Sequence, residues 1–189
     1  MQRALLALCF LVAVSANANA QCAASQVPVR VYLMYGLVSS LMSSGMSDLV
    51  AKMNRIRGVK ATVHEWTESG GIAGDAANQS AAIVIGGHSI GANAAVSAAK
   101  LLNGKKRVAL LLGFDPSSLS SLDAVPSNVA RAIGFRQDHN PFGGNKLVAA
   151  SGGTSVSNIF RDLNHIAIDK NDEIHRISMN AVCAIGSSS

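Results

Sequence analysis

The stretch AAIVIGGHSIGANAAVSAA, residues 81–99, decides how the rest of the chain is interpreted. Its first five residues are apolar, as expected of a buried strand, and its last eight are largely alanine, as expected of a helix. Between them lies Gly-His-Ser-Ile-Gly at residues 87–91. A G-x-S-x-G segment between a strand and a helix is typical of a serine held on a sharp, strained turn, the nucleophile elbow.

The residues around Ser89 have the properties that such a turn requires. A strained backbone needs neighbours without side chains two positions before and two positions after the serine, and Gly87 and Gly91 stand there. The helix that follows would direct the positive end of its dipole at the serine. We therefore predict that Ser89 is a nucleophile. The alternative is a tight turn with a serine that only caps the helix, and His88, inside the turn, cannot fold back onto Ser89.

The first twenty residues have the layout of a secretory signal peptide. Arg3 is followed by an apolar run over residues 4–14, and small residues then end at Ala20, after which we expect cleavage. The run is too short for a stable membrane span. We expect a signal peptide at 1–20 and a single domain at 21–189, in a periplasmic or secreted protein.

Cysteine usage agrees with export. Cys9 falls in the expected signal peptide, which leaves Cys22 and Cys183 near the two ends of the mature chain. In an oxidising compartment a bond between them would stabilise the fold by about 2–5 kcal/mol. The alternative is a pair of free buried thiols.

Charge and aromatic content give no indication of a nucleic-acid partner. The formal charge of +5 is scattered along the chain, and its densest cluster, residues 105–107, is one short loop. Aromatic residues make up 4% of the chain, which argues against stacking platforms for bases.

Apolar runs and glycines predict the order of the elements. We expect strands at 27–35, 59–66, 81–85, 107–113, 129–135 and 155–160, and helices at 46–56, after the Ser89 turn and at 174–185. The glycine-rich residues 69–74 are expected to form a turn, with a short helix beginning within 75–80. Strand and helix alternate over the first half, which predicts an α/β fold with a mainly parallel sheet of about six strands and helices on both faces. No segment is long enough for a cap domain, so none is expected.

A serine nucleophile needs a base to take its proton, and five histidines compete for that role. His165 follows the last expected strand, where the base belongs in a sheet of this kind. The others are less well placed: His64 lies within a strand upstream of the serine, His88 within the turn, His139 early after the penultimate strand, and His175 on the closing helix.

The base in turn needs a carboxylate to orient it. Asp115 ends the strand that follows the Ser89 helix, and Pro116 fixes the turn after it. Asp138, a few residues beyond the next strand, is the alternative acid. Asp162 and Asp169 are expected to serve in turns or caps.

Backbone N–H groups are expected to stabilise the oxyanion that forms during acyl transfer. One should come from Ile90, directly after the serine, and another from Gly36 or Leu37 in the loop after the first strand.

The segments Gly87-His88-Ser89-Ile90-Gly91-Ala92, Gly113-Phe114-Asp115-Pro116 and Asn164-His165-Ile166-Ala167-Ile168-Asp169 together resemble the α/β-hydrolase superfamily, in particular small exported bacterial serine esterases and lipase-like proteins. The resemblance implies cleavage of carboxylic esters by Ser89, His165 and Asp115, without a cofactor. It departs from the superfamily pattern in the loop after the first strand and in having no segment long enough for a lid. An uncapped site suits small soluble esters or esters presented at a surface. The other interpretations are a thioesterase or acyltransferase with the same three residues, and a non-catalytic binding or envelope protein.

Overall fold

The structure is a computed structural model that describes residues 22, 24–37, 43–139 and 141–186. The expected signal segment, residues 1–20, lies outside the described residues, so the predicted division of the chain at residue 20 stays a prediction.

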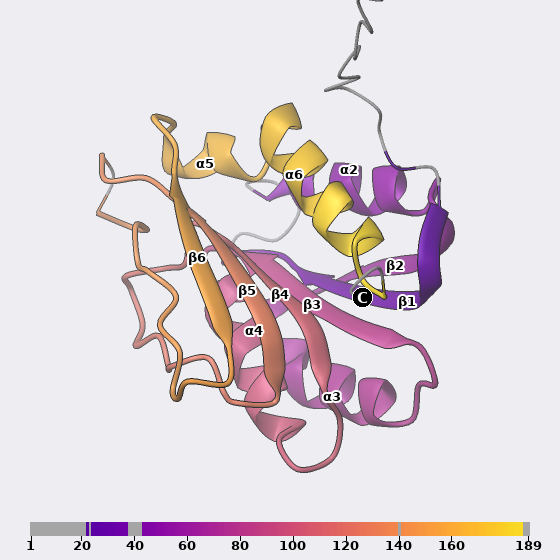
Figure 1. The fold of residues 1–189 in the computed structure, drawn as a ribbon. Coiled ribbons are helices and arrows are strands. Elements are labelled where there is room, and N and C mark those ends of the chain that lie inside the picture. Colours follow the sequence, from indigo (N-terminus) through magenta and orange to yellow (C-terminus); the bar gives the residue numbers. More distant parts are fainter. Residues whose placement is uncertain (1–21, 23, 38–42, 140, 187–189) are drawn as a thin grey trace, which may run out of the picture.

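Six parallel strands form the centre of the molecule, in the order β2-β1-β3-β4-β5-β6 (Figure 1). Their bounds are Ala24–Met34 for β1, Arg57–His64 for β2, Ala82–His88 for β3, Val108–Phe114 for β4, Val129–Arg136 for β5 and Ser155–Phe160 for β6. Every neighbouring pair runs parallel. The predicted parallel sheet of six strands is therefore confirmed.

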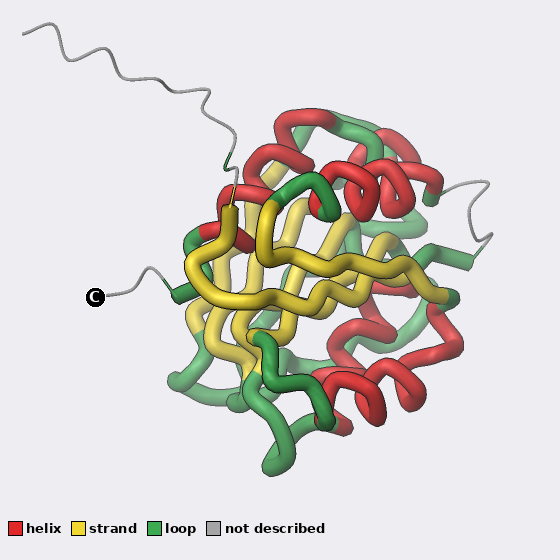
Figure 2. The backbone as a smooth tube through the Cα atoms, turned by 90° about the vertical axis from the view of Figure 1, so that its right-hand side faces the viewer, coloured by secondary structure: helices red, strands yellow, loops and turns green. Residues whose placement is uncertain are grey.

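Helices cover both faces of this sheet (Figures 1 and 2). Their bounds are Ser44–Met53 for α2, Trp66–Glu68 for the 3-10 helix η1, Ser69–Ala77 for α3, Ile90–Leu101 for α4, His165–Ile168 for α5 and Asp172–Cys183 for α6. One apolar cluster joins the sheet to α2 and α6, with Leu49 and Val182 among its buried members. A second joins the opposite face to α3 and α4, with Ile72 and Val96. Strands between these layers are buried on both sides, which explains their continuous apolar sequences.

Helix α3 corrects one expectation. Residues 69–74 were expected to form a turn, yet Ser69–Ala77 is helical, and the short helix expected within 75–80 is instead the end of this helix. Ile72 and Ala76 are buried against the sheet. A Cβ atom added to any of the three glycines of α3 would meet no atom within 4 Å. Burial of the apolar face thus outweighs a cost of about 1 kcal/mol per glycine, which local propensity alone cannot reveal.

The order of the strands creates a crevice at one edge of the sheet. The chain leaves β1 through α2 to reach β2 on one side, whereas it leaves β3 through α4 to reach β4 on the other side. Such a reversal opens a space beyond the carboxyl ends of the two strands, and open α/β sheets bind their ligands there.

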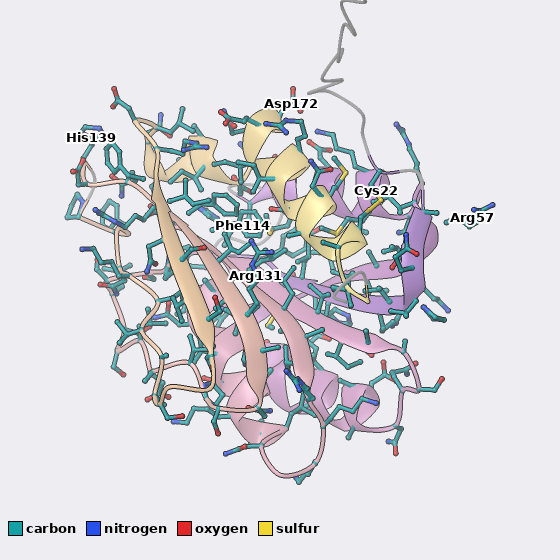
Figure 3. All side chains as sticks on the ribbon, in the orientation of Figure 1. Cys22, Arg57, Phe114, Arg131, His139 and Asp172 are labelled. Carbon is teal, nitrogen blue, oxygen red and sulfur yellow. A yellow bond between two sulfur atoms is a disulfide. The ribbon has the colours of Figure 1, made fainter. Side chains whose placement is uncertain are left out.

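A disulfide links Cys22 to Cys183, with their Cα atoms 6.2 Å apart. It joins the approach to β1 to the last residue of α6, and Figure 3 shows Cys22 beside that helix. The expected pairing is therefore present, and it fits an oxidising environment. Within the described ranges, no helix combines the length and the apolar character needed to cross a membrane.

Candidate active site

Ser89 lies on the expected sharp turn between β3 and α4. Its φ is +56°, and its N–H donates to the carbonyl of Phe114 over 3.0 Å. A side chain at Gly91 would overlap the backbone of Tyr35, and one at Gly87 would overlap the backbone of Gly91. Both glycines are therefore required by close backbone approach, as the sequence pattern indicated.

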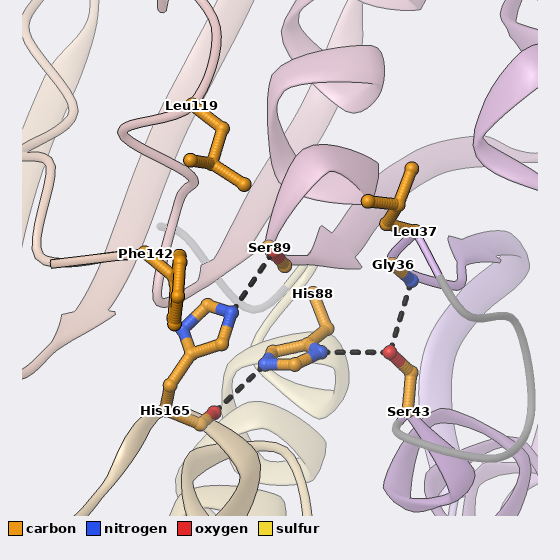
Figure 4. Close-up of a pocket in the computed structure, with 8 residues that line it drawn as sticks. All are labelled: Gly36, Leu37, Ser43, His88, Ser89, Leu119, Phe142 and His165. Carbon is orange, nitrogen blue, oxygen red and sulfur yellow. Dashed lines mark hydrogen bonds between the residues drawn. The ribbon is translucent and has the colours of Figure 1, made fainter. Parts of the chain in front are cut away.

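His165 begins α5 and points its ring at Ser89 (Figure 4). Its Nε2 lies 3.0 Å from Ser89 Oγ, and its Nδ1 lies 2.6 Å from Asp115 Oδ2. The Asn164 side chain caps this short helix by accepting the Ala167 N–H over 2.9 Å. These contacts bring together the three residues that the sequence singled out, although they are up to 76 positions apart.

Asp115 is completely buried and, like Ser89, has a positive φ, here +49°. Its carboxylate accepts hydrogen bonds from Gln137 Nε2 at 2.9 Å, the Gln137 N–H at 3.2 Å and the Gly144 N–H at 2.8 Å. Burial alone would raise the pKa of Asp115, but the hydrogen bonds from His165, Gln137 and Gly144 outweigh it and hold the pKa below its usual value. The group that faces His165 is therefore a carboxylate that three further hydrogen bonds hold in place.

The alternative acid, Asp138, lies elsewhere, on an exposed loop with its carboxylate 3.6 Å from His139 Nε2. His139 itself is at the surface (Figure 3) and bonds Asp162 over 2.7 Å. His64 pairs with Glu68 on η1. None of these residues lines the pocket at Ser89.

The loop after β1 differs in detail from the expectation for the oxyanion site. The Gly36 N–H donates to Ser43 Oγ over 3.0 Å, so this donor is already occupied. Neither the Leu37 N–H nor the Ile90 N–H donates to another residue in the described part of the chain. Of the two positions expected in this loop, only Leu37 therefore has an N–H without an acceptor among the described residues.

His88 and Ser43 form a buried connection beneath the pocket that the sequence did not reveal. His88 Nδ1 lies 2.8 Å from Ser43 Oγ, and His88 Nε2 lies 2.8 Å from the carbonyl oxygen of His165 (Figure 4). Burial first, and then the nearby His165, lowers the pKa of His88 to about 4, so its ring is neutral near pH 7. The sequence identified His88 only as part of the turn and gave no signal for Ser43, because its partners lie far away along the chain.

A cavity of about 180 Å³ opens at Ser89 and His165. Its rim carries three exposed apolar side chains from three loops, Leu37 after β1, Leu119 after β4 and Phe142 after β5. Its volume is below the roughly 300–1,000 Å³ of drug-sized ligand sites, and its mouth is apolar. Such a space admits a small apolar group next to the serine.

No protein-family model matches the chain, and no curated protein matches its sequence. Among solved structures, one described with LipS and LipT, two metagenome-derived lipolytic enzymes, matches with a TM-score of 0.53 at 13% identity, over 84% of this chain and 95% of that chain. The Vlm2 thioesterase domain, solved with a bound dodecadepsipeptide, matches with a TM-score of 0.49 at 11% identity, over 82% of this chain and 92% of that domain. The first likeness, together with the six-stranded parallel sheet, shows an α/β-hydrolase-like fold.

Proposed function

We propose that this protein is an exported serine hydrolase that cleaves small carboxylic esters, with Ser89 as nucleophile, His165 as base and Asp115 as the residue that orients His165. The observation that carries the proposal is the continuous chain of contacts from Ser89 Oγ through the His165 ring to Asp115, at 3.0 and 2.6 Å. This is the order of partners that activates a serine hydroxyl on several unrelated folds.

In the proposed reaction, Ser89 Oγ bonds to the ester carbonyl carbon while its proton passes to His165 Nε2. The carbonyl oxygen becomes an oxyanion, which the N–H groups of Ile90 and Leu37 stabilise, with about 3–4 kcal/mol for each donor. The carbon–oxygen bond to the alcohol then breaks, and His165 returns the proton to the departing oxygen. Water repeats the sequence on the acyl group and frees the serine.

The surroundings of Ser89 support a small apolar acyl group. The cavity of about 180 Å³ has Leu37, Leu119 and Phe142 at its mouth, so a short alkyl chain would be removed from water there. The proposal of export rests on two observations, the Cys22–Cys183 disulfide and the signal-like residues 1–20.

Hydrolysis of p-nitrophenyl butyrate by the purified mature protein tests the proposal. We expect turnover that falls to the level of buffer in Ser89→Ala and in His165→Ala, and lower rates as the acyl chain lengthens beyond the cavity. The matched butyryl thioester, assayed in parallel, measures the preference for oxygen or sulfur esters. Equal activity in Ser89→Ala and the wild type would contradict the mechanism, and an inactive wild type would favour a non-catalytic protein on this fold.

A further inference from the structure

We propose that Ser43 and His88 are a positioning pair. They hold Gly36, which precedes the proposed oxyanion donor Leu37, and the base His165 at the correct positions relative to Ser89. The proposal rests on the proposed function, since it assigns these two residues a task in the same reaction. In the described part of the chain, neither side chain hydrogen-bonds Ser89 Oγ or His165 Nε2; His88 meets His165 at its carbonyl oxygen and across the two rings, whose centroids lie 4.8 Å apart. Both residues would therefore act by positioning the groups that they contact.

The direction of each hydrogen bond follows from the partners. The His165 carbonyl oxygen can only accept, so His88 Nε2 carries the proton of the neutral ring and donates it over 2.8 Å. Nδ1 is then an acceptor, and it receives the Ser43 hydroxyl proton over 2.8 Å. Ser43 Oγ still has lone pairs, and it accepts the Gly36 N–H over 3.0 Å. The series of hydrogen bonds from Gly36 to His165 therefore uses each donor once.

This chain of bonds is shielded from water. Ser43 is fully buried and His88 is 1% exposed. Buried hydrogen bonds of this kind are expensive to leave unmade, because no water replaces a lost partner. His88 also belongs to β3 and directly precedes Ser89, so its ring is anchored in the rigid centre of the sheet.

The two ends of this series of hydrogen bonds are the groups whose position matters for the reaction. One end is the backbone of His165, whose Nε2 must stay 3.0 Å from Ser89 Oγ. The other end is Gly36, which immediately precedes the proposed oxyanion donor Leu37. By engaging the Gly36 N–H, Ser43 fixes the orientation of this peptide group while leaving the Leu37 N–H free for the substrate. Since a misplacement of about 1 Å can cost 10²-fold in rate, these bonds are well placed to affect turnover.

Ser43→Ala is the smallest change that tests the pair, because it removes both bonds of the hydroxyl and little volume. We expect kcat to fall about 10- to 100-fold with KM changed less than about twofold. The inhibition constant of a butyl trifluoromethyl ketone, which forms an oxyanion on the serine, should rise by the same factor as kcat/KM falls. Ser178→Ala is the matched control, since Ser178 is equally buried and donates to the Ile174 carbonyl on α6 over 2.8 Å.

A second pair of variants tests the hydrogen bond between His88 and the His165 carbonyl. His88→Gln retains a side-chain N–H that can reach the His165 carbonyl, whereas His88→Leu is similar in size and retains none. We expect His88→Gln to keep at least ten times the kcat of His88→Leu, with each rate corrected for the active fraction. Equal rates in the two variants would overturn the link to His165.

Amide hydrogen exchange gives a measurement that does not depend on catalysis. Exchange at Gly36 should accelerate in Ser43→Ala and stay unchanged in Ser178→Ala. Unchanged exchange at Gly36 would overturn the link to the loop, even in a protein without esterase activity. If the wild type hydrolyses esters and Ser43→Ala keeps the wild-type kcat and inhibition constant, or only loses melting temperature as Ser178→Ala does, the positioning proposal is wrong and the proposed function stands.

Discussion

Asp115 and Asp169 are both fully buried carboxylic acids, yet their surroundings are opposite. Asp115 accepts hydrogen bonds from a side chain, two backbone N–H groups and His165, which favour its charged form. Neither carboxylate oxygen of Asp169 has a hydrogen bond of normal geometry within the described residues, and burial, offset only in part by Lys170 and the Gly45 N–H, raises its pKa to about 7. At the scale of single residues, the charge state of a buried acid therefore depends on its donors.

The first prediction concerns the acid of the proposed triad. Asp115→Asn should preserve the fold but favour the wrong tautomer of His165, and the precedent for this change is a loss of about 10⁴ in kcat. Asp138→Asn should change kcat less than about twofold, because that carboxylate is exposed and does not line the pocket at Ser89. Steady-state assays on p-nitrophenyl butyrate compare the two variants. A large loss in Asp138→Asn with an active Asp115→Asn would show that the acid was misassigned.

The second prediction concerns Asp169 and pH. In the folded state its pKa is about 7 and in the unfolded chain it is near 3.8, so its contribution to stability is complete below pH 4 and is lost as the pH rises to 7. Asp169→Asn cannot ionise and avoids this loss. The difference in unfolding free energy between the variant and the wild type should grow by about 2–4 kcal/mol from pH 4 to pH 8 in favour of the variant.

Urea unfolding at four pH values measures this difference. The pH dependence that the buried His88 contributes to stability cancels, because both proteins contain this residue. A difference that stays constant with pH would mean that Asp169 keeps its charge in the folded state.

At the scale of elements, the sequence predicted those segments whose pattern is local. The strand before Ser89 and the strand before Asp115 are continuous apolar runs, and both lie in the sheet as expected. The turn between strand and helix carries its own signature in Gly87 and Gly91. Helix α3 could not be predicted in the same way, because three glycines argue against a helix and only packing on the sheet favours it.

The third prediction compares a glycine of helix α3 with a glycine of the turn at Ser89. Gly71→Ala should stabilise the protein by about 0.5–1 kcal/mol, because the new methyl group meets no atom within 4 Å and alanine favours a helix. Gly91→Ala should instead abolish esterase activity or folding, because the methyl group would overlap the carbonyl of Tyr35. Thermal unfolding and ester hydrolysis, measured for both variants, check the pair. A destabilised Gly71→Ala would contradict the helical conformation of residues 69–77.

At the scale of the whole molecule, the parallel sheet explains how distant residues meet. The loops after β1, β3, β4, β5 and β6 all begin at the same edge of the sheet, and they supply Leu37, Ser89, Asp115, Phe142 and His165. Ser89, Asp115 and His165, the residues of the proposed triad, could be picked out from the sequence because each follows a recognisable strand. Gln137, Gly144 and Ser43 could not, because they lie in irregular loops whose conformation depends on the completed fold.

The fourth prediction concerns the disulfide, which closes a loop between positions 161 apart. Replacing both cysteines, as in Cys22→Ser with Cys183→Ser, should lower the unfolding free energy by about 2–5 kcal/mol. Activity at 25 °C should stay within about twofold, because the bond lies at the start of β1, and the site lies beyond the end of that strand. Urea unfolding of the oxidised wild type and the double variant measures the effect. Equal stability would mean that packing alone holds the two ends together.

The central claim is that Ser89 is an activated nucleophile, and covalent labelling tests it most directly. A fluorophosphonate reacts with a serine only when a neighbouring base takes the hydroxyl proton. Intact mass spectrometry of the labelled wild type should show a single adduct, which peptide mapping assigns to Ser89, and Ser89→Ala should show none. An adduct of equal yield in Ser89→Ala, or a folded wild type that stays unlabelled, would contradict the claim.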